Sequence, residues 1–260
     1  MSFKPFIVGT GVNAWSTLQS TIDRQKNAFE KREDIKNQIN NFTSDMKKIQ
    51  TTDALMNNYA SLNVALGAFD LSDDLNNRYF IKRILDEGSI NQSSLANRLQ
   101  DNRYRQLAKN FSAEQFFFRN TSEDSFIRNI SERYINISFE KAVGELNSDL
   151  RLALSFERNL SFVASARTND AAWFQVMANP PIKEVFQKIF GLPLQFGLLD
   201  IDRQHDVMQE KSKIHLGTSD LSILTKKDNI ENAVRLFLLK NQMNDVNIKS
   251  PVQIALSLIS

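Results

Sequence analysis

The chain has 260 residues, of which 42% are hydrophobic and 24% charged, and its 32 basic and 30 acidic side chains give a formal net charge of +2. So even a balance gives no electrostatic reason to expect nucleic acid or an anionic membrane as a partner. The absence of cysteine excludes disulfides, thiolate metal sites and a cysteine nucleophile, and no apolar run approaches the ~20 residues that span a bilayer.

Residues 1–14 are predicted to form a flexible lead-in. The apolar run Phe6-Ile7-Val8 is too short for the core of a cleavable signal peptide, so we do not expect export by the general secretory route. The pattern Gly9-x-Gly11-x-x-Ala14 has the spacing of a dinucleotide-binding turn, which needs a strand before it and a βαβ unit around it. A long polar helix follows instead, so we interpret the glycines as a lead-in ending in a cap at Asn13, and no cofactor is expected.

Helical periodicity dominates from Trp15 onward and predicts an all-α fold of about ten helices, in a single domain over residues 15–260. The first element is predicted to be a long amphipathic helix, because three- and four-residue steps place each of two sets of apolar residues on one stripe. The sets are Trp15, Leu18, Ile22 and Phe29 and, after a charged stretch, Ile35, Ile39, Phe42, Met46 and Ile49. The stripe is narrow, which favours a protruding or coiled-coil-like arm. The mixed charges from Glu30 to Asp34 are interpreted as its solvated face.

Capping residues predict where the later helices begin. The predicted starts are Thr51, Ser72, Asn91, Asp101, Ser125, Asn147, Asn179, Asp228 and Ser250. Gly88 and Gly191 follow two predicted helices, where a left-handed residue often ends the element. The segment 110–123 is the least regular, so a soft subdivision of the domain is expected there.

Phe116, Phe117 and Phe118 lie in that irregular segment. Successive helix positions turn by ~100°, so three adjacent rings cannot all face one groove. Either the rings fill separate gaps in the core, which is the commoner arrangement, or one ring is exposed for a partner. These three residues are the candidate contact with a partner that the sequence predicts.

Two further motifs are better explained as helix starts than as sites. Asn179-Pro180-Pro181-Ile182 partly matches the Asn-Pro-Pro-aromatic motif of amino methyltransferases, but Ile182 offers no stacking face, and Asn followed by Pro is typical of a helix start. Asp70-Leu71-Ser72-Asp73-Asp74 resembles a calcium loop but lacks its glycine and its distal glutamate. We interpret Ser72 and the acids around it as a cap.

The histidines also fall short of a site. His205 and His215 are ten residues apart, so on one helix they point in different directions and do not form a zinc pair. Asp202 and Asp206 flank His205 at helical spacing, and a surface ion pair is the favoured interpretation. No catalytic residue, cofactor site or metal site is predicted.

Several blocks in order carry a family resemblance. They are VALGAFDLSDDLNNRYFIKRIL from Val64, LANRLQDNRY from Leu95, VGELNSDLRLALSFER from Val143, WFQVMANPPIKEVFQKIFGLPLQFGLLDIDRQ from Trp173, and RLFLLKNQ from Arg235. The chain resembles the alphaproteobacterial domain-of-unknown-function family 1217, commonly encoded among flagellar genes. The resemblance implies an all-α fold and, through gene neighbourhood, a link to the flagellum.

We therefore expect a non-enzymatic helical protein that serves flagellar assembly or motility through contacts with protein partners. Two alternatives stay open: an exported structural component of the flagellum, and an enzyme whose charged site is not recognised. The expected location is the cytoplasm, or outside the cell after export by the flagellar apparatus without a cleaved signal peptide.

Overall fold

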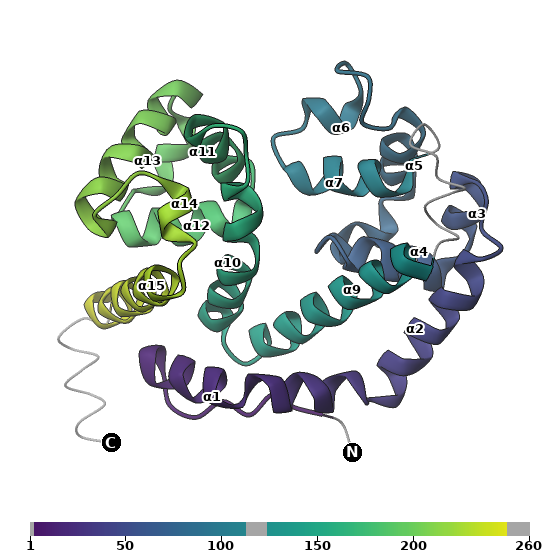
Figure 1. Cartoon of the computed structure of the whole chain (residues 1–260), viewed down its shortest axis with the longest axis horizontal. Helices are drawn as coiled ribbons and strands as arrows, with labels where there is room; N and C mark the ends of the chain where they lie inside the picture. The colour runs from purple at the N-terminus through teal and green to yellow at the C-terminus, as the bar shows by residue number, and fades with distance from the viewer. Residues whose placement is uncertain (1–2, 113–123, 249–260) are drawn as a thin grey trace. The chain divides into compact units, whose positions relative to one another are not determined.

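The computed structural model describes residues 3–112 and 124–248, and it confirms the all-α prediction, because this part of the chain contains no strand. Its fourteen α-helices exceed the predicted ten, partly because helices of four residues such as α6 and α14 carry almost no periodicity. The internal contacts divide the chain into two compact units (Figure 1). Unit 1 comprises residues 1–6 and 21–142, and unit 2 comprises residues 7–20 and 143–260.

The boundaries between the units fall after residue 6 and inside two helices, α1 (Gly11–Glu30) and α9 (Asp124–Gly144). The soft subdivision expected near residues 110–123 stays a prediction. The expectation of a single domain over residues 15–260 stays a prediction. Phe116, Phe117 and Phe118 lie outside the described residues, as does the helix start predicted at Ser250.

The long N-terminal helix is two helices, which corrects the prediction. Helix α1 spans Gly11–Glu30 and α2 spans Glu33–Met46, and between them Arg32 leaves the helical conformation with ψ 138°. The Arg32 guanidinium lies 5.1 Å from the centre of the Phe29 ring and pairs with Asp34 at 2.6 Å. Glu33 and Asp34 occupy the first turn of α2, where the helix dipole favours acids.

The start of α1 also differs from the prediction. The helix begins at Gly11 and not at Trp15, so Asn13 is a first-turn residue whose carbonyl accepts a hydrogen bond from Thr17. Gly9 and Gly11 both have positive φ, 83° and 53°, which glycine adopts without strain. The chain can therefore turn directly into the helix, with no strand before it.

Unit 1 continues from α2 through short helices and most of the long helix α9. They are α3 (Thr52–Asn57), α4 (Tyr59–Gly67), the 3₁₀ helix η1 (Ser72–Asn76), α5 (Arg78–Glu87), α6 (Leu95–Arg98), α7 (Asn102–Phe111) and α9 (Asp124–Gly144). Helix α4 is buried on nearly all sides and packs against α2 and α3, whereas α5, α6 and α7 pack on one another.

Thr51 and Asp101 cap α3 and α7 as predicted, each accepting a backbone N–H. Ser72 does not cap a helix. It opens the separate 3₁₀ turn η1, which has no side-chain cap. Asn91 likewise forms a local turn with Ser93, and α6 begins later.

Unit 2 contains the remaining helices. They are α10 (Ser148–Ala164), α11 (Asn169–Met177), α12 (Pro180–Phe190), the 3₁₀ helix η3 (Leu194–Leu198), α13 (Ile201–Leu216), α14 (Leu221–Leu224) and α15 (Lys227–Ile248). Helix α12 is central, because it packs against α10, α11, α13 and α15. The Phe186 ring lies 5.2 Å from both the Phe156 and Trp173 rings, which makes it the hub of the aromatic core.

Helix α12 matches its prediction residue by residue. The Asn179 side chain accepts the Ile182 N–H at 3.2 Å, Pro180 occupies the first turn, and Gly191 ends the helix in the left-handed conformation with φ 64°. The predicted apolar face is buried in full: Ile182, Val185, Phe186, Ile189 and Phe190. Asn147 caps α10 as predicted, whereas Asp228 lies inside the first turn of α15, which begins at Lys227.

Candidate functional site

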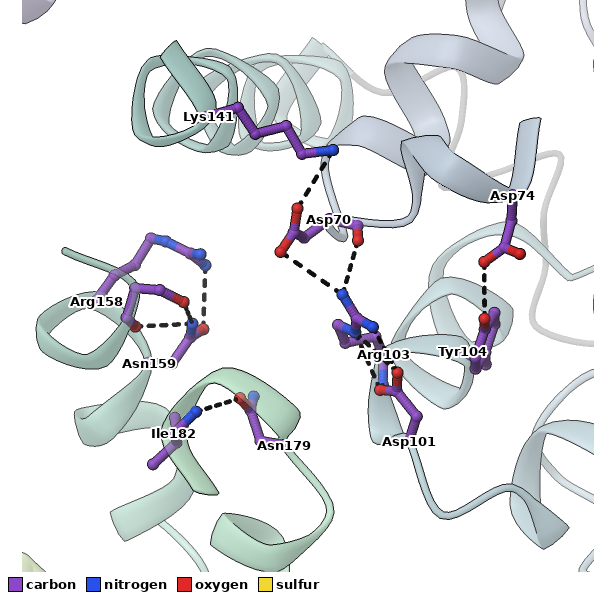
Figure 2. Close-up of polar contacts among 11 residues, drawn as sticks. Asp70, Asp74, Asp101, Arg103, Tyr104, Lys141, Arg158, Asn159, Asn179 and Ile182 are labelled. Atoms are coloured by element: carbon purple, nitrogen blue, oxygen red, sulfur yellow. Dashed lines mark hydrogen bonds and ion pairs between the residues drawn. The ribbon is translucent and has the colours of Figure 1, made fainter. Parts of the chain in front are cut away.

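A polar cluster of unit 1 surrounds Asp70, in the turn after α4 (Figure 2). Its carboxylate pairs with Lys141 at 3.3 Å and Arg103 at 3.6 Å, and its carbonyl accepts a further hydrogen bond from Arg103 at 2.8 Å. The same guanidinium pairs with Asp101 at 2.7 Å. Two carboxylates and two cations from the α4 turn, α7 and α9 thus balance one another.

The neighbouring Tyr104 extends this cluster. Its hydroxyl donates to the Asp74 carboxylate at 2.7 Å (Figure 2). Its ring packs edge-on against Phe80, with the centroids 5.2 Å apart. Burial, followed by the hydrogen bond to Asp74, raises the pKa of Tyr104. The phenol therefore stays protonated and fixes η1 against α7.

We assign the Asp70 cluster a structural role. Asp70 has a φ of 59°, which is unusual for a residue other than glycine, although Asp tolerates it better than most. In a calcium loop this carboxylate would bind the ion. Here Arg103 and Lys141 pair with the Asp70 carboxylate and hold it in place. Asp70 and Asp74 of this segment have separate partners, because Asp74 binds Tyr104.

His205 of unit 2 lies among more exposed groups. Its ring stacks on Phe174 of α11, with the centroids 4.7 Å apart and the planes inclined by 14°. Nε2 lies 3.3 Å from the Asp170 carboxylate and Nδ1 lies 3.4 Å from that of Asp206. Gln209 donates to Asp170 at 2.8 Å and contacts Nε2 of the histidine at 2.9 Å.

The predicted contact of His205 with Asp206 is therefore present, and a second carboxylate, that of Asp170 from α11, lies beside the same ring; each contact is an ion pair when the imidazole is protonated. Asp202 does not join the ring contacts of His205 that the structure describes. Sequence analysis missed Asp170, because it lies 35 positions away and only the packing of α11 on α13 brings it near. His215 is elsewhere, stacked on Phe190 at 5.8 Å, and burial, with Lys240 and Lys211 adding to it, lowers its pKa.

A shallow recess of about 370 Å³ lies beside His205. Its lining is Asp170, His205, Asp206, Gln209, Glu210 and Lys213. Three carboxylates against one lysine make the recess acidic. Within the described part of the chain, no group of three or more His, Asp or Glu residues is arranged to hold a metal ion.

An exposed apolar segment precedes the same helix. Leu198 is 86% exposed, and Leu199 and Ile201 are also exposed, although neighbouring Phe196 is buried. The buried Gln204 holds this segment, because its side-chain amide donates to the Leu199 carbonyl at 2.7 Å and accepts from Lys183 at 3.1 Å. Burial lowers the pKa of Lys183. Leu198 and Leu199 are thus exposed on a turn that the hydrogen bonds of Gln204 hold in place.

We call these neighbouring groups the α11–α13 surface. It consists of Phe174, Leu198, Leu199 and Ile201, with His205 and the carboxylates of Asp170, Asp202 and Asp206 beside them. One helical turn separates Ile201 from His205, which stacks on Phe174, so the apolar part adjoins the acidic recess. Exposed apolar groups with a polar rim are typical of protein-binding sites.

Comparison with known proteins identifies the family. The model of the family described as "Protein of unknown function (DUF1217)" matches residues 68–230, which is more than half of the chain. The protein belongs to this family. A crystal structure of a protein from Agrobacterium tumefaciens, determined by the Northeast Structural Genomics Consortium, is similar in fold, with a TM-score of 0.73 and 23% identity over 94% of this chain and 99% of that one. No curated protein matches the chain.

The DUF1217 match includes both polar groupings, since the Asp70 cluster and the α11–α13 surface fall within residues 68–230. No helix among residues 3–112 and 124–248 combines the length and hydrophobicity needed to cross a bilayer. Of the two groupings, the cluster has its charges matched internally, whereas the surface leaves apolar side chains in water. The α11–α13 surface is therefore the candidate functional site.

Proposed function

We propose that this DUF1217 protein is non-enzymatic and acts by binding another protein through its α11–α13 surface. The observation that carries this proposal is the exposure of Leu198, Leu199 and Ile201 on a turn that buried side chains anchor. Exposed apolar area is unfavourable in water, and burying it against a partner recovers roughly 25 cal/mol per Å². A flexible loop would lose entropy on binding, whereas this turn is already ordered.

The process that we propose is flagellar assembly or motility. This part rests on the resemblance to a family whose genes commonly lie among flagellar genes, which is an association and not a physical argument. The protein would act in the cytoplasm or after export by the flagellar apparatus. Flagellar components are accordingly the partners to test first.

Photo-crosslinking in the native host tests the binding proposal. A photoreactive residue replaces Leu198, and in a control strain it replaces Tyr79 of α5, which is 82% exposed and belongs to unit 1. We expect a discrete cross-linked product with a protein from position 198 and none at the same mass from position 79. Equal products from both positions, or none from position 198, would contradict a binding role for this surface.

A gene deletion tests the process separately. We expect the deletion strain to grow normally but to swim poorly, and the wild-type gene to restore swimming. A Leu198→Asp variant is expected to fold but to restore swimming less well than a Tyr79→Asp variant. Full motility of the deletion strain would remove the flagellar proposal and leave the binding proposal to the cross-linking result.

A further inference from the structure

We infer that the partner of the α11–α13 surface is a cationic amphipathic helix, with its apolar face on the leucines and a Lys or Arg side chain in the acidic recess. This inference rests on the proposed binding function and specifies the chemistry of the partner. The basis is the sign and position of the charges around the apolar residues.

The charges beside the apolar residues are predominantly negative. Asp170 and Asp206 flank the His205 ring, and their side chains are 69% and 72% exposed, so both remain accessible to a partner. Asp202 is exposed one residue after Ile201. Arg203 is two positions before His205, which corresponds to about 200° of rotation, so it lies on the side of α13 opposite to the His205 ring and three positions before Asp206.

The recess adds a place for one cationic group. Gln209 and His205 form its polar wall with the two aspartates, and Lys213 is the single cation among its lining residues. Its volume of about 370 Å³ accommodates the end of a long side chain. An arginine there can form charge-assisted hydrogen bonds with carboxylates, which are shorter and stronger than neutral ones.

The apolar residues suit a helix because they form a short exposed strip next to this recess. Leu198, Leu199 and Ile201 lie within four positions, and Phe174 adjoins them through His205. An amphipathic helix places apolar residues at i, i+3, i+4 and i+7 on one face and carries charged residues at the edge of that face. One face can thus cover the strip while a flanking cation enters the recess.

Binding of designed peptides to the full chain tests the inference. Two labelled 18-residue helical peptides share one leucine-alanine face, and their polar faces carry either arginine and lysine or glutamate. Fluorescence anisotropy is expected to show saturable binding of the cationic peptide only, weakened by added salt because the contact is partly electrostatic. Equal binding of both peptides, or binding of neither, would overturn the inference.

Paired variants locate the contact. Asp170→Asn with Asp206→Asn is expected to weaken binding of the cationic peptide by about five- to tenfold, the loss of two exposed charge pairs. Leu198→Ser is expected to weaken it on the order of tenfold through lost apolar burial. The control pair, Asp23→Asn with Asp73→Asn, removes the same charge from exposed positions in unit 1 and is expected to leave binding unchanged. Thermal unfolding of each variant verifies its fold.

The outcomes separate this inference from the proposed function. Unchanged affinity in the Asp170/Asp206 variant would overturn the cationic partner even if Leu198 cross-links a protein in cells. Sedimentation without peptide tests a second copy of the chain as the occupant. If the chain self-associates and Leu198→Asp abolishes the self-association, the occupant of the surface is a second copy and the inference of a cationic helix is wrong. A monomeric chain agrees with the inference.

Discussion

The two compact units use similar charged residues in opposite ways. In unit 1, the Asp70 carboxylate has two cations within 3.6 Å, and its side chain is only 12% exposed. In unit 2, Asp170 and Asp206 contact one histidine and remain largely open to solvent. The contrast shows that the number of charges in a cluster does not identify a site. Exposure and the balance of charge distinguish the Asp70 network from the proposed binding surface.

The apolar residues show the same contrast inside unit 2. Phe186 is fully buried among aromatic rings, whereas Phe174, on the neighbouring helix α11, is 39% exposed against His205. The surface therefore rests on a well-packed core. Removing a ring from the core must destabilise the unit, but removing the exposed ring must not.

Phe186→Ala is the largest predicted effect. It removes the ring that contacts both Phe156 and Trp173 and leaves a cavity, so we expect a loss of about 3–5 kcal/mol in the free energy of unfolding. Urea denaturation followed by tryptophan fluorescence measures the loss, because Trp173 reports on this core. Phe174→Ala is the matched control, with an expected loss below about 1 kcal/mol. Similar losses in the two variants would contradict the distinction between core and surface rings.

Asp70→Asn tests the balance of charge in unit 1. The amide keeps the size of the side chain and tolerates the positive φ, but it leaves Lys141 without that carboxylate. We expect the free energy of unfolding to fall by about 1–3 kcal/mol, which lies between the losses typical of breaking an exposed and a buried ion pair. Urea denaturation followed by circular dichroism measures it. The same substitution at exposed Asp73 is the control, and an equal loss there would mean that the network has no special role.

Sequence analysis predicted the helix starts where a side chain caps the first turn. Asn179 with Pro180, Asn147, Asp101 and Thr51 all begin helices in the structure. These signals are local, since the cap accepts an N–H from two or three residues ahead. The break between α1 and α2 could also have been found. Phe29 and Ile35 are six residues apart, a step that leaves the apolar stripe of one helix, and Glu33 and Asp34 mark a new first turn.

The candidate site could not be predicted in the same way, because it depends on packing between distant segments. The Asp170–His205 contact joins α11 to α13, and the exposure of Leu198 depends on Gln204 holding the turn. An exposed leucine and a buried one are identical in sequence. The Leu198–Leu199 pair reads as core, and only the structure shows it in solvent. The partner contact predicted at Phe116–Phe118 stays a prediction, since those residues lie outside the described part of the chain.

Asn179→Ala measures how much one cap contributes to unit 2. The variant loses the hydrogen bond from the Ile182 N–H, whereas Pro180 still favours the helix start. We therefore expect the free energy of unfolding to fall by about 1 kcal/mol. Chemical denaturation followed by tryptophan fluorescence provides the measurement. Asn179→Asp retains an accepting oxygen and is expected to recover most of the loss. A variant with aspartate as unstable as the alanine variant would show that capping is not the cause.

Glu87→Gln is the smallest predicted effect and depends on pH. Glu87 binds Arg83 at 2.6 Å and accepts the Leu95 N–H at the start of α6, and these contacts, the Arg83 bond first, lower its pKa below the ordinary value near 4.5. An acid whose pKa is lowered by folding stabilises the protein above that ordinary value, and the contribution disappears as the pH falls through the folded-state pKa. We therefore expect the variant to be less stable than the parent at pH 7, by less than Asp70→Asn, and the difference to shrink steadily below pH ~4.5. Thermal unfolding at several pH values measures this, with Glu231→Gln, exposed on α15, as the control for loss of one charge. A difference that persists at pH ~3 would show that the carboxylate contacts of Glu87 do not stabilise unit 1 in the way that its geometry implies.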